Sequence, residues 1–299
     1  MNLQQLETFL WLARLQSFTR TAQRLNATQS TISMRVSDLE RELGVQLVDR
    51  SQRQIHITGK GLDLMVYAER MHKLVSDIRS QVGDPAKIGG TIRIAAAELV
   101  ALTWLPGLVS RLNALYPGSK VELEVGLRGT SHSRLKSGEL QLCILPVFGA
   151  ETPGFEYTSL GEVDFRFMAS PGFDRGGNPF SPADIAGLPL IMLGPNSVVA
   201  ELQLDWFRRN GVTPGTVTQS NSMEISAGLV RSGLGVSFLP LDYYAADIAA
   251  GRMICLETSP AISAVPFCVI QSANAPSYVD DITTVIKEVV RSLDPPAQA

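Results

Sequence analysis

Hydrophobic positions between residues 3 and 43 recur with the spacing of three short amphipathic helices. The second helix reads "TRTAQRLN", with Thr19 as a candidate N-cap and Ala22 and Leu25 facing inward. The third runs from a candidate N-cap at Thr28 to a helix-ending glycine at Gly44. The inward positions of the first and third helices are Leu3, Leu6, Phe9, Leu10, Ala13, Ile32, Val36, Leu39 and Leu43.

The outer face of the third helix carries no solvated charge in its first two turns. Its residues there are Gln29, Ser30, Ser33 and Met34, which are small or neutral and suit close contact. A turn of three residues joins this helix to the preceding one, and such a pair is typical of a helix-turn-helix, here from Phe18 to Ser37. The second helix of that motif enters the DNA major groove, where a glutamine amide can pair with adenine.

The segment after the third helix predicts a basic β-wing. "VQLVDRSQRQIHIT" reads as two short strands, with Arg50 and Arg53 at the tip between them. Residues 1–60 carry a net charge of +3 and the rest −6, so the basic end favours a polyanion partner. We expect DNA contacts from Thr28, Gln29, Ser30, Ser33, Met34, Arg35, Arg50 and Arg53, the three arginines mainly at phosphates.

A long helix from Thr58 to about Val82 follows the wing. Apolar residues four and three apart form a heptad seam, which favours a partner helix in a homodimer. The alternative is a helix that packs on the core of its own domain, and the pattern leaves it open. The seam residues are Leu64, Ala68, Met71, Val75, Ile78 and Val82. "GDPAKIGG" then interrupts all periodicity and reads as a hinge.

Beyond the hinge, apolar strands such as "TIRIAAA", "QLCILP" and "GVSFLP" alternate with amphipathic helices. This alternation predicts parallel α/β sheets. Two sets of it predict two lobes with a ligand cleft between them. We expect a DNA-binding domain at 1–58, a linker helix and hinge at 59–87, and an effector domain at 88–299. Within the effector domain, lobe 1 is expected at about 91–161 and 266–299, and lobe 2 at about 162–265.

Several predicted strands end in segments that face the expected cleft. Thr130, Ser197 and Ser222 begin helices there, where free backbone N–H groups can hold an anion, although capping alone explains each of them. Glu98 is expected either to hold a cationic or hydroxyl-rich ligand or to lie exposed on a loop. The candidate effector-binding residues are Ala97, Glu98, Leu99, Gly129, Thr130, Ser131, Asn196, Ser197, Asn221 and Ser222.

Composition narrows the functional class. The three cysteines have neither the number nor the spacing of a disulfide framework or zinc site, and the chain lacks a phosphate loop, a nucleophile elbow and a His–carboxylate cluster. No apolar run reaches the roughly 18 residues of a membrane span, and the N-terminus does not read as a signal peptide. We therefore expect a cytoplasmic protein that is not an enzyme, with no catalytic residues, metal or cofactor.

The whole chain resembles the LysR-type transcriptional regulators. The strongest match is "FTRTAQRLNATQSTISMRVSDLERELGVQLVDRSQRQIHITGKG", which is similar to the winged helix-turn-helix of that family; "LPGLVSRLNALYPGSKVELEV" and "VRSGLGVSFLP" are similar to its effector domain. The resemblance implies an N-terminal winged helix-turn-helix domain, a long linker helix and a two-lobed, periplasmic-binding-protein-like α/β domain.

The resemblance also implies partners. They are double-stranded promoter DNA, a small-molecule effector of unknown identity, and further copies of the chain in a dimer or a dimer of dimers, with RNA polymerase as a further candidate. Two positions depart from the family pattern: Met34 stands where arginine is usual, and the first strand ends in Ala97 and Glu98 instead of carboxylate-binding Ser or Thr. The alternatives are a redox-sensing regulator and, from other classes, a solute-binding protein or an α/β enzyme.

Overall fold

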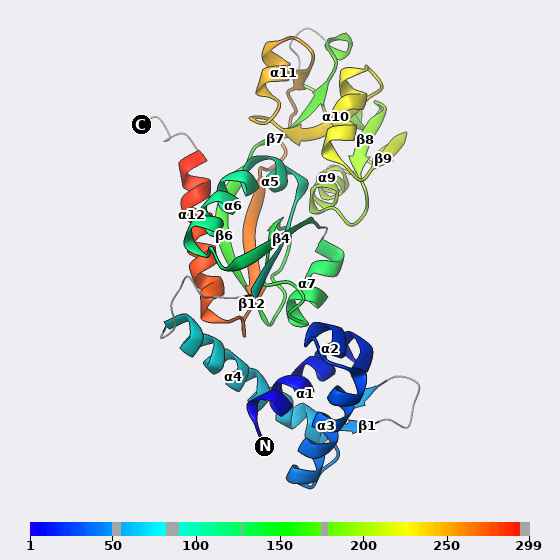
Figure 1. The fold of residues 1–299 in the computed structure, drawn as a ribbon. Helices are drawn as coiled ribbons and strands as arrows, with labels where there is room; N and C mark the ends of the chain where they lie inside the picture. Colours follow the sequence, from blue (N-terminus) through cyan, green and yellow to red (C-terminus); the bar gives the residue numbers. More distant parts are fainter. Residues whose placement is uncertain (50–54, 82–89, 127, 175–178, 294–299) are drawn as a thin grey trace.

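The computed structural model describes residues 1–49, 55–81, 90–126, 128–174 and 179–293. They form three bodies stacked along one axis: an N-terminal head, lobe 1 in the middle and lobe 2 at the far end (Figure 1). The head comprises residues 1–58, and the linker helix α4 (Gly59–Gln81) leads from it to lobe 1. In the described part of the chain, no helix is both long and apolar enough to span a lipid bilayer.

Three helices and a two-stranded wing build the head. Its elements are α1 (Leu3–Leu15), α2 (Phe18–Arg24), α3 (Gln29–Leu43), β1 (Val48–Asp49) and β2 (His56–Ile57). The expected N-cap at Thr28 is present, but α2 begins earlier than expected, because the Ser17 hydroxyl accepts the Arg20 N–H and caps the helix in place of Thr19. Gly44 ends α3 in the left-handed conformation (φ 67°). Arg50 and Arg53, predicted at the wing tip, lie outside the described residues.

The head has its own hydrophobic core. Its buried residues include Leu6, Phe9, Leu12, Val36, Leu39, Leu47 and Val48. Ile32, Val36 and Leu39 face inward as expected from the spacing, whereas Leu43 is exposed at the last turn of α3. The core fixes the opposite face of α3 toward solvent.

Helix α4 packs on this core, which corrects the first half of the predicted dimer seam. Ala68 is buried, and Leu64 and Met71 pack against the head core, because α4 lies along α1. Val75 is partly buried, Ile78 is exposed, and Val82 lies outside the described residues. The apolar side chains that α4 presents to solvent are Leu62, Val66, Tyr67, Leu74 and Ile78, each at least 50% exposed.

Lobe 1 consists of residues 90–163 and 265–293. Its helices are α5 (Glu98–Thr103), α6 (Leu105–Leu115), α7 (Arg128–Lys136) and α12 (Ser277–Leu293). Its strands are β3 (Gly90–Ala96), β4 (Ser119–Val125), β5 (Leu142–Pro146), β6 (Phe155–Val163) and β12 (Val265–Ser272), in the order β4-β3-β5-β12-β6. Strands β4, β3 and β5 are parallel, and β12 runs antiparallel to both β5 and β6.

Lobe 2 consists of residues 165–256. Its helices are η2 (Pro171–Phe173), α8 (Pro182–Ala186), α9 (Val198–Arg209), α10 (Met223–Arg231) and α11 (Ala245–Ala249). Its strands are β7 (Phe165–Ala169), β8 (Leu190–Leu193), β9 (Val217–Ser220), β10 (Val236–Pro240) and β11 (Ile254–Leu256), in the order β11-β7-β10-β8-β9.

Both sheets are mixed: the predicted parallel strands are present in each lobe, and antiparallel strands complete each sheet. The antiparallel pairs involve β12 and β7, because the chain passes between the lobes twice, from β6 directly into β7 and from β11 through residues 257–264 into β12. These crossings place Phe165 and Phe267 between the two sheets, where the cleft forms.

Candidate DNA interface and effector cleft

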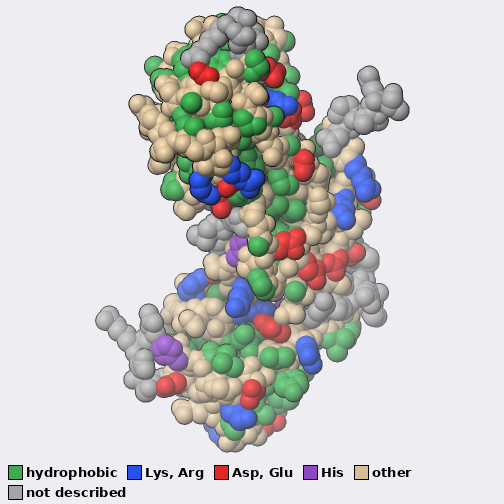
Figure 2. Space-filling view, turned by 180° about the vertical axis from the view of Figure 1, so that it is seen from behind, with side chains coloured by type: hydrophobic (Ala, Val, Ile, Leu, Met, Phe, Trp, Pro, Cys, Tyr) green, Lys and Arg blue, Asp and Glu red, His purple; other side chains and the backbone are tan. Residues whose placement is uncertain are grey.

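The outer face of α3 presents neutral side chains to solvent. Gln29 and Ser30 are exposed, Met34 is 59% exposed, and Ser33 is partly exposed. Over the back of the molecule, charged side chains of both signs are scattered among neutral ones (Figure 2). Shape and hydrogen-bonding groups, more than net charge, distinguish this helix.

Two of the residues predicted to contact DNA form hydrogen bonds with other residues of the head. The Thr28 hydroxyl accepts the Thr31 N–H at 3.2 Å and lies 2.8 Å from the Ser30 hydroxyl, so it stabilises the start of α3. Arg35 donates from Nη1 to the hydroxyl of the buried Thr8 at 3.4 Å. Arg35 therefore reaches toward α1 in this structure, and its contact with a DNA phosphate stays a prediction.

A cavity of about 290 Å³ lies between the lobes, and six predicted effector residues line it. These six are Ala97, Glu98, Leu99, Asn196, Ser197 and Asn221. Met223, which follows Asn221 and Ser222 in a segment expected to face the cleft, also lines the cavity. Sequence reasoning missed the rest of the lining, which is Val125, Gly126, Leu145, Pro146, Phe165, Leu193, Gly194, Pro195, Val198, Val199 and Phe267. The missed residues are mostly apolar and look like ordinary core positions in the sequence, although Pro146 and Leu193 are recognisable as strand ends.

Two further predicted residues, Ser131 and Ser222, are not among the described residues that line the cavity. Ser131 is buried and hydrogen-bonds to the Cys143 thiol. Gly129 and Thr130 lie in the first turn of α7, and their side chains are outside the described part. The Ser222 hydroxyl is engaged by Glu98, to which it donates a hydrogen bond.

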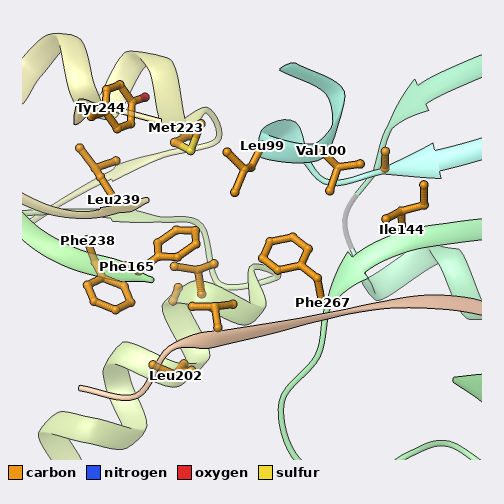
Figure 3. Packing of buried hydrophobic residues seen from close by; sticks show 14 of the residues in the cluster. Leu99, Val100, Ile144, Phe165, Leu202, Met223, Phe238, Leu239, Tyr244 and Phe267 are labelled. Carbon is orange, nitrogen blue, oxygen red and sulfur yellow. The ribbon is translucent and has the colours of Figure 1, made fainter. Parts of the chain in front are cut away.

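Apolar side chains from both lobes meet at the cavity. Figure 3 shows Leu99 of α5 and Met223 of α10 approaching each other from opposite lobes, and Phe165 and Phe267 between the two sheets. All four side chains are buried. The cleft is therefore a preformed apolar space with few polar groups, as is usual for small-molecule sites.

Glu98 bridges the two lobes. Its Oε1 accepts the Ser222 hydroxyl at 2.7 Å, and its Oε2 accepts the backbone N–H of Met223 at 2.5 Å. Met223 begins α10, so the carboxylate occupies the positive end of that helix dipole. The expected anion site at this helix is thus filled by the chain's own carboxylate, and Glu98 is neither a loop residue nor a free ligand for a cation.

The start of α9 has a different environment. Ser197 is its N-cap residue and is buried, but its side chain makes no capping hydrogen bond. Asn196, Ser197 and Val198 all line the cavity. The unpaired N–H groups of this first turn and the Ser197 hydroxyl are therefore available to an acceptor in the cleft.

The three cysteines lie in surroundings that disfavour the thiolate form. Burial raises the pKa of Cys143 to about 12 and also raises the pKa values of Cys255 and Cys268. All three are free thiols, and a raised pKa disfavours the reactive thiolate.

Comparison with known proteins places these features in one family. Residues 3–62 match the family described as "Bacterial regulatory helix-turn-helix protein, lysR family", and residues 86–289 match the LysR substrate binding domain. The chain is 29% identical over 266 residues to the SDS degradation transcriptional activation protein of a Pseudomonas species, covering 87% of this chain and 86% of that protein. It is 28% identical over 246 residues to the transcriptional regulator IlvY of Escherichia coli, covering 80% and 82%.

Solved structures show the same fold along the full length. A variant of full-length OxyR from Pseudomonas aeruginosa has a TM-score of 0.72 at 22% identity, covering 100% of this chain and 99% of that one. Full-length LysG from Corynebacterium glutamicum, with bound effector Arg, has a TM-score of 0.67 at 24% identity, covering 99% and 100%. The chain belongs to the LysR family of transcriptional regulators, which are not enzymes, and consists of its helix-turn-helix and effector-binding domains.

Proposed function

We propose that this regulator reads duplex promoter DNA through the outer face of α3. Gln29, Ser30, Ser33 and Met34 supply an amide, two hydroxyls and a thioether, which suit base edges and thymine methyl groups. The Thr28 cap holds the start of the helix, and Arg50 and Arg53 of the wing supply phosphate contacts. Because its target is DNA, we expect the protein to act in the cytoplasm.

The effector in this proposal is a small, largely apolar molecule held between the lobes. Glu98 is the one ionisable side chain among the described residues that line the cavity, and its carboxylate is bonded to lobe 2. A polar group of the effector would accept hydrogen bonds from Ser197 and the first turn of α9. Occupancy would bias the angle between the lobes, since Glu98 and the ligand both join them.

Helix α7 offers a route from the cleft to the head. Gly126, just before this helix, lines the cavity, and Glu139, just after it, forms an ion pair with Arg20 of α2. Between them, Gly138 packs directly on Trp11 of α1. Figure 1 shows α7 reaching down to α2. A shift of α7 on ligand binding would therefore change how the head is held.

The exposed apolar side of α4 is the proposed dimer surface. Leu62 and Val66 are four residues apart, as are Leu74 and Ile78, so each pair shares a side of the helix, and the apolar surface turns around α4 from the first pair to the second. A second copy of this helix would cover them. This surface replaces the predicted seam, whose first residues pack within the head.

The observation that carries the proposal is that one chain combines an exposed neutral helix face with an apolar cleft between two lobes. The test starts with a binding-site selection from random duplex DNA with the full chain. A thermal-shift screen of metabolites follows, in which a ligand at 100 times its dissociation constant adds about 2.7 kcal/mol of stability. The proposal predicts an enriched consensus, and at least one stabilising metabolite that alters affinity for it. Failure to enrich any sequence would contradict it.

A further inference from the structure

A second cavity, of about 90 Å³, lies where the head meets lobe 1. Trp11, Arg14 and Arg24 line it from the head, and Gln141, Asn274 and Tyr278 line it from lobe 1. It is distinct from the cleft between the lobes, with which it shares no lining residue. Its lining is rich in polar groups, whereas the lining of the cleft is largely apolar.

The charges around this cavity do not balance. Arg14 pairs with Glu69 at 3.4 Å, and the same carboxylate accepts a hydrogen bond from Asn274 at 3.3 Å. Among the described residues, no carboxylate lies within ion-pair distance of Arg24. The cavity therefore holds two guanidinium groups and one carboxylate, with His72 as a further titratable neighbour.

The positions of the two arginines show the same excess of positive charge. The guanidinium carbons of Arg24 and Arg14 lie 4.3 Å and 5.5 Å from the centre of the Trp11 ring, so one indole contacts both cations. The Nε atoms of both arginines are buried and have no hydrogen-bond acceptor among the described residues. Burial lowers the pKa of Arg24, and the charges of Arg93 and Arg14 lower it further against the opposing effects of Tyr278 and Glu7.

We propose that this cavity binds a small oxyanion, a phosphate or carboxylate group, between Arg24 and Arg14. Planar guanidinium groups suit such oxygens, since two parallel N–H donors match two acceptors. A cavity of this size admits an inorganic ion or the acid group of a small metabolite. The bound anion would neutralise the excess charge and join α2 to the start of α12, so it would fasten the head to lobe 1.

The test is isothermal titration of the full chain with three sodium salts: phosphate, acetate and chloride. The key variant is Arg24→Gln, which removes the charge from a partly exposed position and keeps good helix propensity. Arg24→Lys retains the charge without the two parallel donors. The matched control is Arg41→Gln, an exposed arginine of the same head that pairs with Asp38.

Saturable binding of phosphate or acetate, weakened at least tenfold in Arg24→Gln and unchanged in Arg41→Gln, supports the site. Preference between phosphate and acetate identifies which acid group it takes, and intermediate affinity in Arg24→Lys supports the paired donors. Equal affinity in wild type and Arg24→Gln would overturn the proposal, as would a chloride response equal to that of both oxyanions. Neither result bears on DNA reading or on the cleft, since the site uses none of their residues.

Discussion

The outer face of α3 and the lining of the cleft are two recognition surfaces that differ in how they meet water. On α3, neutral polar groups are exposed and Met34 is 59% exposed. In the cleft, Leu99, Phe165 and Phe267 are buried between the lobes. The first surface can exchange water for base edges with little structural change, whereas the second is part of the hydrophobic core.

Because of this difference, we expect a substitution to affect a different property on each surface. A change on α3 should alter DNA binding and leave folding intact. A change in the cleft should alter folding first, because its lining residues also pack the lobes together.

The largest expected effect comes from placing a charge on each surface. Leu145→Glu puts a carboxylate at a position that is 2% exposed in β5, and should lower the unfolding free energy by about 3–5 kcal/mol, the cost of an uncompensated buried charge. Met34→Glu should change the unfolding free energy by less than about 0.5 kcal/mol. Urea unfolding of both variants measures these free energies. Equal decreases in the two variants would contradict the difference between the cleft and the α3 surface.

Glu98→Gln tests the bridge between the lobes. The amide retains only one acceptor oxygen and loses the charge, so the contact should weaken by about 1–2 kcal/mol, allowing for the partial exposure of the side chain. Hydrogen exchange at the Met223 amide, which donates to this carboxylate, should quicken accordingly. Glu162→Gln, an exposed carboxylate on β6, is the control. An unchanged exchange rate in Glu98→Gln would show that Glu98 does not stabilise the start of α10.

Gly138→Ala tests the contact between α7 and the head. Gly138 has φ 71°, and a methyl group there would lie 3.0 Å from Trp11. Gly149→Ala is the matched control, with φ 81° and open space around it. Both variants should lose about 1 kcal/mol from backbone strain, but only Gly138→Ala should speed hydrogen exchange in α1. Identical exchange in α1 for the two variants would argue against docking through Trp11.

The smallest expected effect is on base preference. Met34→Ala should relax selection at one base pair and leave the salt dependence of binding unchanged, because the thioether contacts a base rather than a phosphate. Arg53→Ala should lower the salt slope by about one and weaken all sequences alike. Site selection on both variants at two salt concentrations separates them. An unaltered consensus for Met34→Ala leaves the reading to Gln29, Ser30 and Ser33.

The sequence predicts the α3 surface better than the cleft for a physical reason. A helix exposes its outer face through a local spacing, so Ile32, Val36 and Leu39 alone define where Gln29 and Met34 point. The cleft depends on contacts between residues far apart in the chain. The hydrogen bond that Ser222 donates to Glu98, and the placement of Phe165 and Phe267 at one cavity, arise from the order of strands, which apolar runs do not encode.

The same limit explains the errors in the fold. The heptad spacing of α4 is compatible with both a partner helix and the head core, and only the packing of Ala68 and Met71 distinguishes them. Strand β6 cannot be predicted from apolar runs, because its residues are all exposed or partly buried. The cap at Ser17 instead of Thr19 reflects two equivalent hydroxyls close together in the sequence.

The most direct test of the account is the DNA affinity of wild type and Leu193→Trp, each with and without the metabolite that stabilises the wild type. Leu193 lines the cleft at the end of β8, so a tryptophan there should fill it and leave α3 untouched. We predict that the metabolite changes the affinity of the wild type for its selected site by about fivefold or more, within the usual range of allosteric coupling, and does not change that of Leu193→Trp. An unchanged wild-type affinity, or the same change in both proteins, would contradict control of α3 from the cleft.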